Sequence, residues 1–159
     1  MLLAVFSDAH GNQKAMRRAV ETRRPDHVIF LGDGIRDAAA VERVFPEIPF
    51  ILLRGNCDAG IPGYDDSILF TLDGVRIFAA HGHRHGVKLD LGGFYNSVCC
   101  SGSALGLYGH THVPRIDSED GVTLMNPGSV GGYPASYGLV HIEKGVFRCE
   151  LVQEKRRLL

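Results

Sequence analysis

The chain has 159 residues, which is enough for one domain with a buried core and short for two domains. Hydrophobic residues make up 45% of the chain and charged residues 22%, a balance typical of a globular protein. The formal net charge of −1 provides no basic surface for general nucleic-acid binding, and no apolar run approaches the roughly 18 residues of a membrane span. We therefore expect neither nucleic acid nor a membrane as a stable partner.

The start of the chain and its cysteines favour a cytoplasmic protein. The apolar run Leu2–Phe6 follows Met1 without a basic segment or a small-residue cleavage site, so it predicts a buried strand rather than a signal peptide. The cysteines show no CxxC spacing, and without an export signal we expect them to be reduced. They are Cys57, Cys99, Cys100 and Cys149, of which the adjacent pair is expected in the core. The basic run Glu154–Arg157 is interpreted as a solvated tail.

Six apolar runs predict β-strands, and helical patterns separate the early ones. Most of the runs are continuous rather than alternating, which indicates strands covered on both faces. In chain order they are Leu2–Phe6, His27–Leu31, Phe50–Leu53, Val75–Ala80, Ala104–Tyr108 and Val122–Met125. The first third of the chain therefore predicts a βαβαβ arrangement.

Three segments have the apolar spacing of amphipathic helices. Asn12–Arg24 carries one apolar stripe and is followed directly by a proline. In Asp37–Phe45, we expect Asp37 to act as the N-cap. The third segment, Asp90–Gly102, has helical spacing that two consecutive glycines weaken.

The rest of the chain is rich in predicted hairpins, in which two apolar segments flank a short turn. The pairs are Ser67–Leu72 with Val75–Phe78, Val113–Asp117 with Val122–Met125, and Tyr137–Ile142 with Val146–Leu151. No linker, repeat or low-complexity segment interrupts the pattern. We therefore predict a single α/β domain over residues 1–159 with mixed sheets.

Chemically active side chains follow the predicted strands at the point where each strand ends. Ligands of open α/β sheets bind beyond the carboxyl ends of the strands, where such loops converge. The residues at these ends are Asp8 and His10, Asp33, Asn56 and Asp58, His81, His83 and His85, His110 and His112, and finally Asn126 and Ser129. Each short motif alone also fits an ordinary turn or helix cap. Their coincidence at one edge predicts a shared site.

The residue types in this group indicate a metal centre. Carboxylates and imidazoles are ligands of borderline divalent metals such as zinc, manganese, iron and cobalt. Two carboxylates, an amide oxygen and four histidines exceed what one tetrahedral ion uses. They suit two ions about 3.5–4 Å apart, joined by one carboxylate and one oxygen derived from water.

The ordered motifs D-x-H, G-D, G-N-x-D, H-G-H and G-H-T-H resemble those of the calcineurin-like metallophosphoesterases. Within that superfamily, the chain is similar to the small bacterial and archaeal phosphodiesterases that consist of the bare catalytic domain. The motifs extend from Asp8 to Ser129. The resemblance implies a four-layer αββα sandwich in which two sheets pack face to face and helices cover the outside.

The resemblance also assigns the ligands. One metal would take Asp8, His10 and His112; the other would take Asn56, His81 and His110, and Asp33 would bridge them. The ions would be manganese in the first instance, with iron, zinc or nickel as alternatives. The implied reaction is hydrolysis of a small phosphodiester or nucleotide by attack of a metal-bridging hydroxide. Asp33, Asn56 and His83 are the residues expected to take part in catalysis.

The stretch "GNCD", Gly55 to Asp58, departs from many relatives, which carry histidine where this chain has Cys57. A thiol with an ordinary pKa near 8.5 cannot make the bonds of an imidazolium at neutral pH. We therefore expect a site that needs a good leaving group or takes its proton from a water or from His83. General acid catalysis typically contributes about 10²–10⁴-fold, so its loss is survivable.

Several neighbouring residues allow two readings from sequence. Asp58 either orients a histidine ligand or makes a salt bridge or a turn, and Arg54 either binds a phosphate or forms a surface ion pair. His83 contacts substrate phosphate or makes a structural hydrogen bond. Arg84 and His85 are expected to face solvent, and Asn126 and Ser129 to shape the floor of the pocket.

Two other functions stay open from sequence. One is a protein-interaction scaffold, because a eukaryotic retromer subunit resembles this fold and serves mainly in assembly with an altered metal site. The complete set of ligands favours catalysis over that alternative. The other is a phosphomonoesterase, since two metals and a hydroxide can attack several electrophiles. The oligomeric state is open between a monomer and a homodimer.

Overall fold

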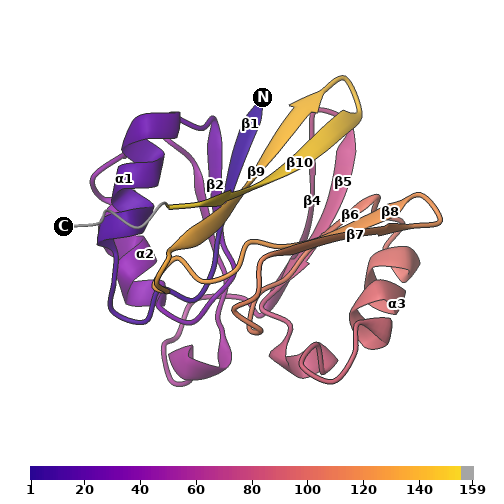
Figure 1. Ribbon diagram of the computed structural model, residues 1–159, viewed down its shortest axis with the longest axis horizontal. Coiled ribbons are helices and arrows are strands. Elements are labelled where there is room, and N and C mark those ends of the chain that lie inside the picture. The colour runs from indigo at the N-terminus through magenta and orange to yellow at the C-terminus, as the bar shows by residue number, and fades with distance from the viewer. Residues whose placement is uncertain (155–159) are drawn as a thin grey trace.

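The computed structural model describes residues 1–154, so of the basic run only Glu154 lies within the described part of the chain. Two five-stranded sheets form the centre of the molecule (Figure 1). The first has the order β10-β9-β1-β2-β3, and the second has the order β4-β5-β6-β8-β7. Both sheets are mixed. In the first, β1, β2 and β3 are parallel and the β9–β10 hairpin pairs antiparallel with β1. In the second, β5, β6 and β8 are parallel, and β4 and β7 pair antiparallel at the two edges.

The strands include all six that the sequence predicts, with ends that differ by at most one residue. The first sheet consists of β1 (Leu2–Phe6), β2 (His27–Phe30), β3 (Phe50–Leu52), β9 (Ser136–Glu143) and β10 (Val146–Gln153). The second consists of β4 (Ser67–Leu72), β5 (Val75–Ala80), β6 (Leu105–Leu107), β7 (Arg115–Glu119) and β8 (Val122–Asn126). The three predicted hairpins are β4–β5, β7–β8 and β9–β10.

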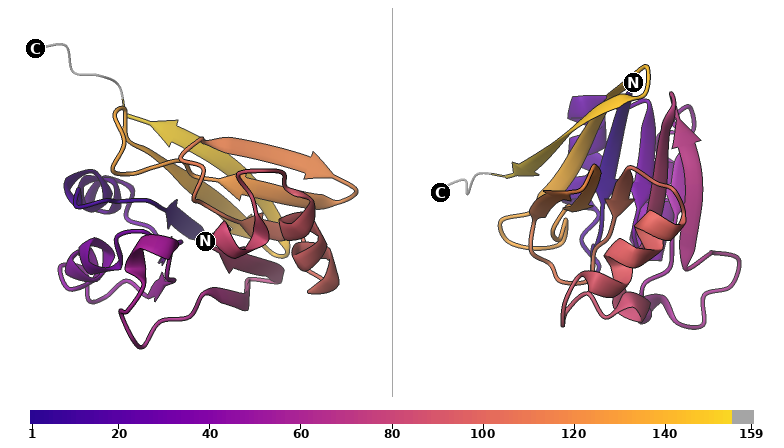
Figure 2. Two further views of the ribbon diagram at one scale, coloured as in Figure 1. Left: turned by 90° about the horizontal axis from the view of Figure 1, so that it is seen from below. Right: turned by 90° about the vertical axis from the view of Figure 1, so that its right-hand side faces the viewer.

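The core between the two sheets explains the continuous apolar strands. One face of each sheet packs on the other sheet, and this layer includes Leu3, Val5, Ile29, Ile77 and Leu105, all with no exposed surface. The opposite faces are covered by helices, so both faces of the central strands are buried (Figure 2). The predicted four-layer α/β sandwich is confirmed.

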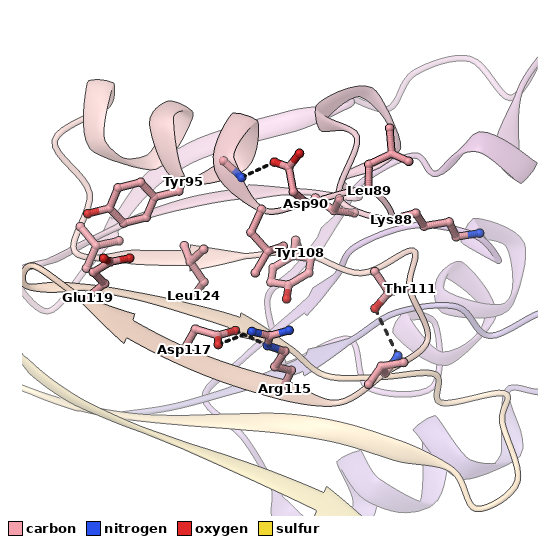
Figure 3. Close-up of a pocket in the computed structure, with 15 residues that line it drawn as sticks. Lys88, Leu89, Asp90, Tyr95, Tyr108, Thr111, Arg115, Asp117, Glu119 and Leu124 are labelled. Atoms are coloured by element: carbon pink, nitrogen blue, oxygen red, sulfur yellow. Dashed lines mark hydrogen bonds and ion pairs between the residues drawn. The ribbon is translucent and has the colours of Figure 1, made fainter.

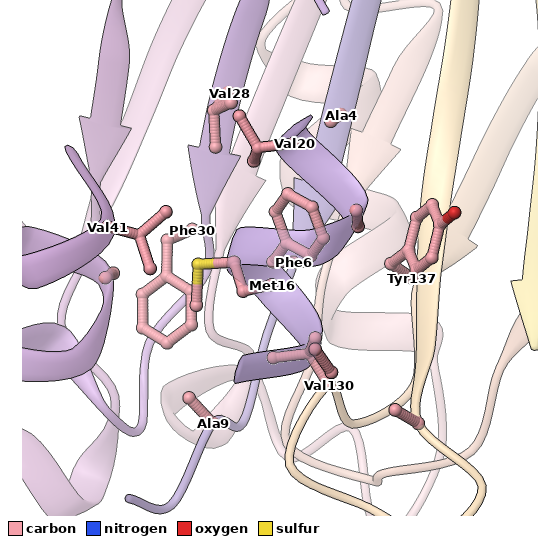
Figure 4. Close-up of a cluster of buried hydrophobic side chains, with 14 of the residues drawn as sticks. Ala4, Phe6, Ala9, Met16, Val20, Val28, Phe30, Val41, Val130 and Tyr137 are labelled. Atoms are coloured by element: carbon pink, nitrogen blue, oxygen red, sulfur yellow. The ribbon is translucent and has the colours of Figure 1, made fainter. Parts of the chain in front are cut away.

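Helices α1 (Lys14–Arg23) and α2 (Ile35–Glu42) cover the outer face of the first sheet. Met16 of α1 and Val41 of α2 pack there against Phe30, and Phe6 lies beside them (Figure 4). Alternate residues of each strand therefore serve the two different cores.

Helix α3 (Gly92–Cys100) covers the second sheet and forms despite its two N-terminal glycines. Phe94 and Val98 are its buried residues, and they pack with Tyr108 and Leu124 of the sheet. The expectation that Cys99 and Cys100 lie in the core is wrong, since both are exposed. The face of α3 that carries Phe94 and Val98 occupies the core instead.

Helix α2 begins earlier than predicted. Gly34 occupies the N-cap position, so Asp37 lies in the first turn and is not the N-cap. The carboxylate of Asp58, distant in the sequence, accepts hydrogen bonds from the N–H groups of Gly34 and Ile35, both at 3.0 Å. A tertiary contact thus satisfies the helix start that the local sequence leaves open. No helix in the described part of the chain has both the length and the apolar character to cross a membrane.

Candidate metal centre

The loops that follow β1, β2, β3, β5 and β6 meet at one edge of the two sheets, at the bottom of Figure 1. Two triads of side chains there place one donor atom each within 4.8 Å of the others: Asp8, His10 and His112, and Asp33, His81 and His110. The first sheet supplies the two carboxylates, and the loops after β5 and β6 supply His81 and the histidines of G-H-T-H. The site therefore spans the seam between the two sheets.

Asp8 lies at the centre of the site and is fully buried. Its Oδ2 accepts hydrogen bonds from the hydroxyl of Ser7 and from the backbone N–H of His110. Its Oδ1 has no hydrogen-bond partner among the described residues. This oxygen lies 3.0 Å from Nε2 of His112 and 3.9 Å from Nε2 of His81. One oxygen thus fixes the carboxylate, and the other is left free toward the histidines.

In His81, as in Asp8, one side-chain atom makes a hydrogen bond and the other has no partner. It has no exposed surface, and its Nδ1–H donates a hydrogen bond of 3.0 Å to the carbonyl of Leu31. That bond sets the tautomer and leaves Nε2 with a lone pair. Nε2 is buried without a hydrogen-bond partner in residues 1–154, at 3.4 Å from Oδ2 of Asp33. Buried polar atoms without partners are costly, and a cation between these donors would satisfy them.

The surroundings of Asp33 keep its carboxylate ionised, the form that binds a metal. Burial raises its pKa, but the neighbouring ring of His81 and the hydrogen bond from the backbone N–H of Cys57 outweigh burial and hold the pKa well below its usual range. The bond from Cys57 N–H to Oδ1 measures 2.7 Å. Burial, followed by the neighbouring His81, lowers the pKa of His110 to about 4. At neutral pH, Asp33 is therefore ionised and His110 is neutral, which are the forms that bind metal.

The backbone at the site is strained where the ligands stand. Non-glycine residues with positive φ are uncommon, and five of the nine within residues 1–154 are predicted ligands. They are Asp8 (56°), His10 (44°), Asp33 (61°), His110 (67°) and His112 (62°). The other four lie at a helix C-cap and in hairpin turns, where this conformation is ordinary. Strain concentrated at one group of side chains indicates a functional site.

Two glycines make room for the carboxylates. A Cβ atom at Gly55 would lie 2.0 Å from Oδ1 of Asp33, and one at Gly109 would lie 2.0 Å from the hydroxyl oxygen of Ser7. Both distances are far below van der Waals contact. The glycines of G-N-x-D and G-H-T-H are thus required by close approach to the buried carboxylates.

The site and the fold match a known family. Residues 1–145 match the calcineurin-like phosphoesterase superfamily domain. The chain belongs to this superfamily. The "Phosphodiesterase YfcE" of Escherichia coli (strain K12) is 31% identical to this phosphoesterase over 170 aligned residues, which cover 88% of this chain and 87% of that protein. The predicted class, a metal-dependent phosphoric ester hydrolase, is confirmed.

Solved structures share the fold of this phosphoesterase. A Streptococcus pneumoniae protein, described as a predicted phosphoesterase, matches with a TM-score of 0.81 at 23% identity, over 96% of this chain and 88% of that one. Vps29 from Entamoeba histolytica in complex with Zn²⁺ matches with a TM-score of 0.78 at 20% identity, over 96% of this chain and 99% of that one. At these sequence identities the similarity shows a shared fold and carries no conclusion about activity.

Asn56 and Cys57 lie on the exposed side of the phosphoesterase centre. Sγ of Cys57, Oδ of Asp33 and a ring nitrogen of His10 lie within 4.8 Å of one another, so the thiol is close to both triads. The hydrogen bond with Asp33, then burial, raises the pKa of Cys57. Asn56 donates to this thiol at 3.5 Å through Nδ2. The sequence predicts Cys57 beside the ligands or the substrate, from its position within "GNCD"; the structure adds its contact with Asp33.

Asp58 binds backbone N–H groups and does not orient a histidine ligand. Its buried carboxylate accepts four backbone N–H groups, those of Asp33, Gly34, Ile35 and Gly55, at 2.7 to 3.0 Å. The expected contact with a histidine ligand is wrong, because the Leu31 carbonyl takes that role for His81. Asp58 instead holds the loop of Asp33 against the loop of Asn56.

Replacing Asp58 with alanine is expected to destabilise the phosphoesterase. The change leaves buried N–H groups without an acceptor, so we expect a loss of about 3–5 kcal/mol in the free energy of unfolding. The measurement is urea denaturation of the metal-free protein, with Asp65→Ala as the matched control because Asp65 is exposed. A loss equal to that of the control would contradict this role.

Asn126 and Ser129 brace the site from β8 and the loop behind it. Asn126 is fully buried, and its Nδ2 donates to the carbonyl of Gly109 at 2.9 Å and to the hydroxyl of Thr111 at 3.0 Å. Ser129 donates its hydroxyl to the backbone carbonyl of Asp8 at 2.7 Å. These bonds fix the G-H-T-H loop and the turn at Asp8, in agreement with the expectation that Asn126 and Ser129 shape the floor of the pocket.

The remaining candidates lie on the side of β5. Arg54 forms an ion pair with Asp66 at 3.2 Å, which agrees with the second of the two roles expected for Arg54, a surface ion pair. The ring of His83 lies 5.4 Å from that of His81, and burial followed by the neighbouring His81 lowers the pKa of His83. The expectation that His85 faces solvent is wrong. It is half-buried and packs edge-on against Phe94 at 5.3 Å, because the apolar core under α3 extends to it.

Proposed function

We propose that this chain is a dinuclear phosphodiesterase that acts on a small phosphodiester or nucleotide. One divalent ion would be held by Asp8, His10 and His112 and the other by Asn56, His81 and His110, with Asp33 between them. The observation that carries the proposal is the pair of buried atoms without hydrogen bonds, Oδ1 of Asp8 and Nε2 of His81, that point into the two triads. The donor chemistry of both triads fits manganese, iron or zinc.

When bound, the two cations would supply Lewis-acid charge for the phosphate and lower the pKa of a water. The side chains of the protein provide the remaining parts. Asp33 is charged at neutral pH and is fixed by the Cys57 N–H, so it would present a negative charge to the ions. His83 is neutral at that pH and half-buried beside His81, where its ring can donate a hydrogen bond to a phosphate oxygen. A neutral imidazole is a weak acid, which again favours a good leaving group.

Different observations bear on the two alternatives, a phosphomonoesterase and an interaction scaffold. The E. coli relative is named a phosphodiesterase, which favours a diester over a phosphomonoester. The likeness to Vps29 supports an interaction scaffold as the second candidate, but it rests on the fold alone. The completeness of both triads favours catalysis. Manganese as the native metal, a homodimer and a cytoplasmic location stay predictions of the sequence.

Turnover on matched esters tests the proposal. Protein stripped with a chelator and refilled with manganese should hydrolyse bis(p-nitrophenyl) phosphate faster than p-nitrophenyl phosphate. Higher activity on the monoester would favour the phosphomonoesterase. Absence of turnover on both, with metal bound, would favour the scaffold.

Cys57 lies where a protonated group could assist the leaving oxygen. Replacing Cys57 with histidine is expected to raise kcat for a diester with an alkyl leaving group by about 10-fold or more, because an imidazolium is a better acid than this thiol. The rate for a nitrophenyl ester should change little, since nitrophenolate leaves without protonation. The measurement compares kcat for both esters, and Cys57→Ser serves as the control of similar size. An unchanged alkyl-ester rate would rule out a missing acid.

A further inference from the structure

A cavity of about 650 Å³ lies between α3 and the β7–β8 hairpin, outside the two triads (Figure 3). Pockets for small molecules span roughly 300–1,000 Å³, so this one can hold a group much larger than a methyl or glyceryl ester. Its walls are mixed: apolar side chains such as Leu91 and Leu124 alternate with Tyr95, Tyr108 and several charged residues. None of these residues belongs to the proposed metal ligands.

The cavity adjoins the loops that carry the ligands. Thr111, which lies between His110 and His112, lines it. Val87 lines it as well and packs against Gly82, the neighbour of His81, so closely that a Cβ atom at Gly82 would lie 2.8 Å from it. The cavity therefore begins where the ligand loops end, and a molecule bound at the metals can extend into it.

Tyr108 presents an unused polar group to this cavity. The residue is 2% exposed and lines the cavity, yet its hydroxyl makes no hydrogen bond to any described residue. Figure 3 shows the ring in the middle of the pocket with the hydroxyl directed across it toward Arg115. The guanidinium of Arg115 is engaged with Asp117 through bonds of 2.6 and 2.7 Å. The hydroxyl is therefore open to the cavity, where a bound molecule can supply its hydrogen-bond partner in place of water.

The charges along the cavity select against a second anionic group. Figure 3 shows Lys88 and Thr111 at the end near the ligand loops, and Tyr95 and Glu119 at the other end. A phosphate thus meets a cation at the near end, whereas a further phosphate would meet a carboxylate at the far end. Leu89 adds an apolar rim, since 91% of its surface is exposed.

We propose that this cavity binds one ester arm of the phosphodiester substrate, and that this arm is an uncharged, ring-bearing group of about the size of a nucleoside. The proposal rests on the proposed function and names its substrate class. The apolar walls would cover the ring, and the hydroxyl of Tyr108 would bond a polar atom of the arm. The specificity of the enzyme would then be set by α3 and the β7–β8 hairpin.

Two esters with the same leaving group test the proposal. They are the p-nitrophenyl ester of thymidine monophosphate and methyl p-nitrophenyl phosphate, assayed with the manganese-loaded protein. We expect kcat/KM to be at least about 10-fold higher for the thymidine ester, because only its arm buries surface in the cavity. A thymidine ester bearing a second phosphate on the sugar should lose most of this advantage.

Variants at the cavity should reduce that preference. Tyr108→Phe is expected to lower the kcat/KM ratio of the thymidine ester to the methyl ester by about 3- to 10-fold, the effect of one hydrogen bond. Leu89→Ala should lower the ratio by about 2- to 5-fold, and its high exposure means that the fold does not depend on it. The matched controls are Tyr133→Phe and Val146→Ala, both at exposed positions that do not line this cavity.

The outcomes separate the two proposals. Equal kcat/KM for the two esters, or a ratio that neither cavity variant changes, would overturn the assignment of the cavity while leaving the phosphodiesterase intact. Failure to cleave either ester with metal bound would overturn the proposed function and the substrate class with it. A preference reduced by both cavity variants and by neither control supports the assignment.

Discussion

Asparagine in place of Asp33 is expected to reduce kcat for an activated phosphodiester by at least about 10³-fold, because the charge between the two cations is lost. The substitution conserves shape, and the amide oxygen can still accept the hydrogen bond from Cys57 N–H. The loop geometry should therefore survive, so the loss isolates the charge. The measurement is steady-state hydrolysis of bis(p-nitrophenyl) phosphate at saturating manganese.

Asp65→Asn is the matched control for this experiment, since Asp65 is an exposed aspartate that belongs to neither triad. Thermal unfolding of both metal-free variants shows whether each protein is folded. If a folded Asp33→Asn protein retains wild-type turnover, Asp33 does not bridge two metals.

Removal of metal is expected to lower the unfolding temperature by about 8–16 °C. A ligand present at about 1,000 times its dissociation constant stabilises the folded state by about 4 kcal/mol, and each kcal/mol shifts the midpoint by about 2–4 °C for a chain of this size. The physical origin lies in Asp8 and His81, whose buried free atoms gain a partner only when a cation is bound. The measurement is calorimetry with chelator and after manganese is restored.

The same sample should contain two manganese ions per chain by elemental analysis. The Asp33→Asn variant provides the comparison, because it should bind fewer ions and show a smaller thermal shift on adding manganese. One ion per wild-type chain, or equal shifts in both proteins, would contradict the dinuclear proposal.

Much of the fold could be predicted because its signals are local. Continuous apolar runs reflect strands buried on both faces, and the two-residue turns after Leu72 and Glu143 each end in a glycine that closes a hairpin. The start of α2 could not be predicted in this way. Asp37 is a good local N-cap, but the carboxylate of Asp58 caps the helix from another loop and moves its start to Ile35.

The chain order of residue types was enough to indicate the chemistry: Asp8, Asp33, Asn56 and the histidines each follow a strand, and strand ends converge. Only the tertiary structure decides which atom of each side chain is free. Oδ2 of Asp8 is taken by Ser7 and by the N–H of His110, and Nδ1 of His81 is taken by the carbonyl of Leu31. The sequence pattern shows which side chains could bind a metal. The packing of the two sheets decides which of their atoms form hydrogen bonds and which are left for a metal.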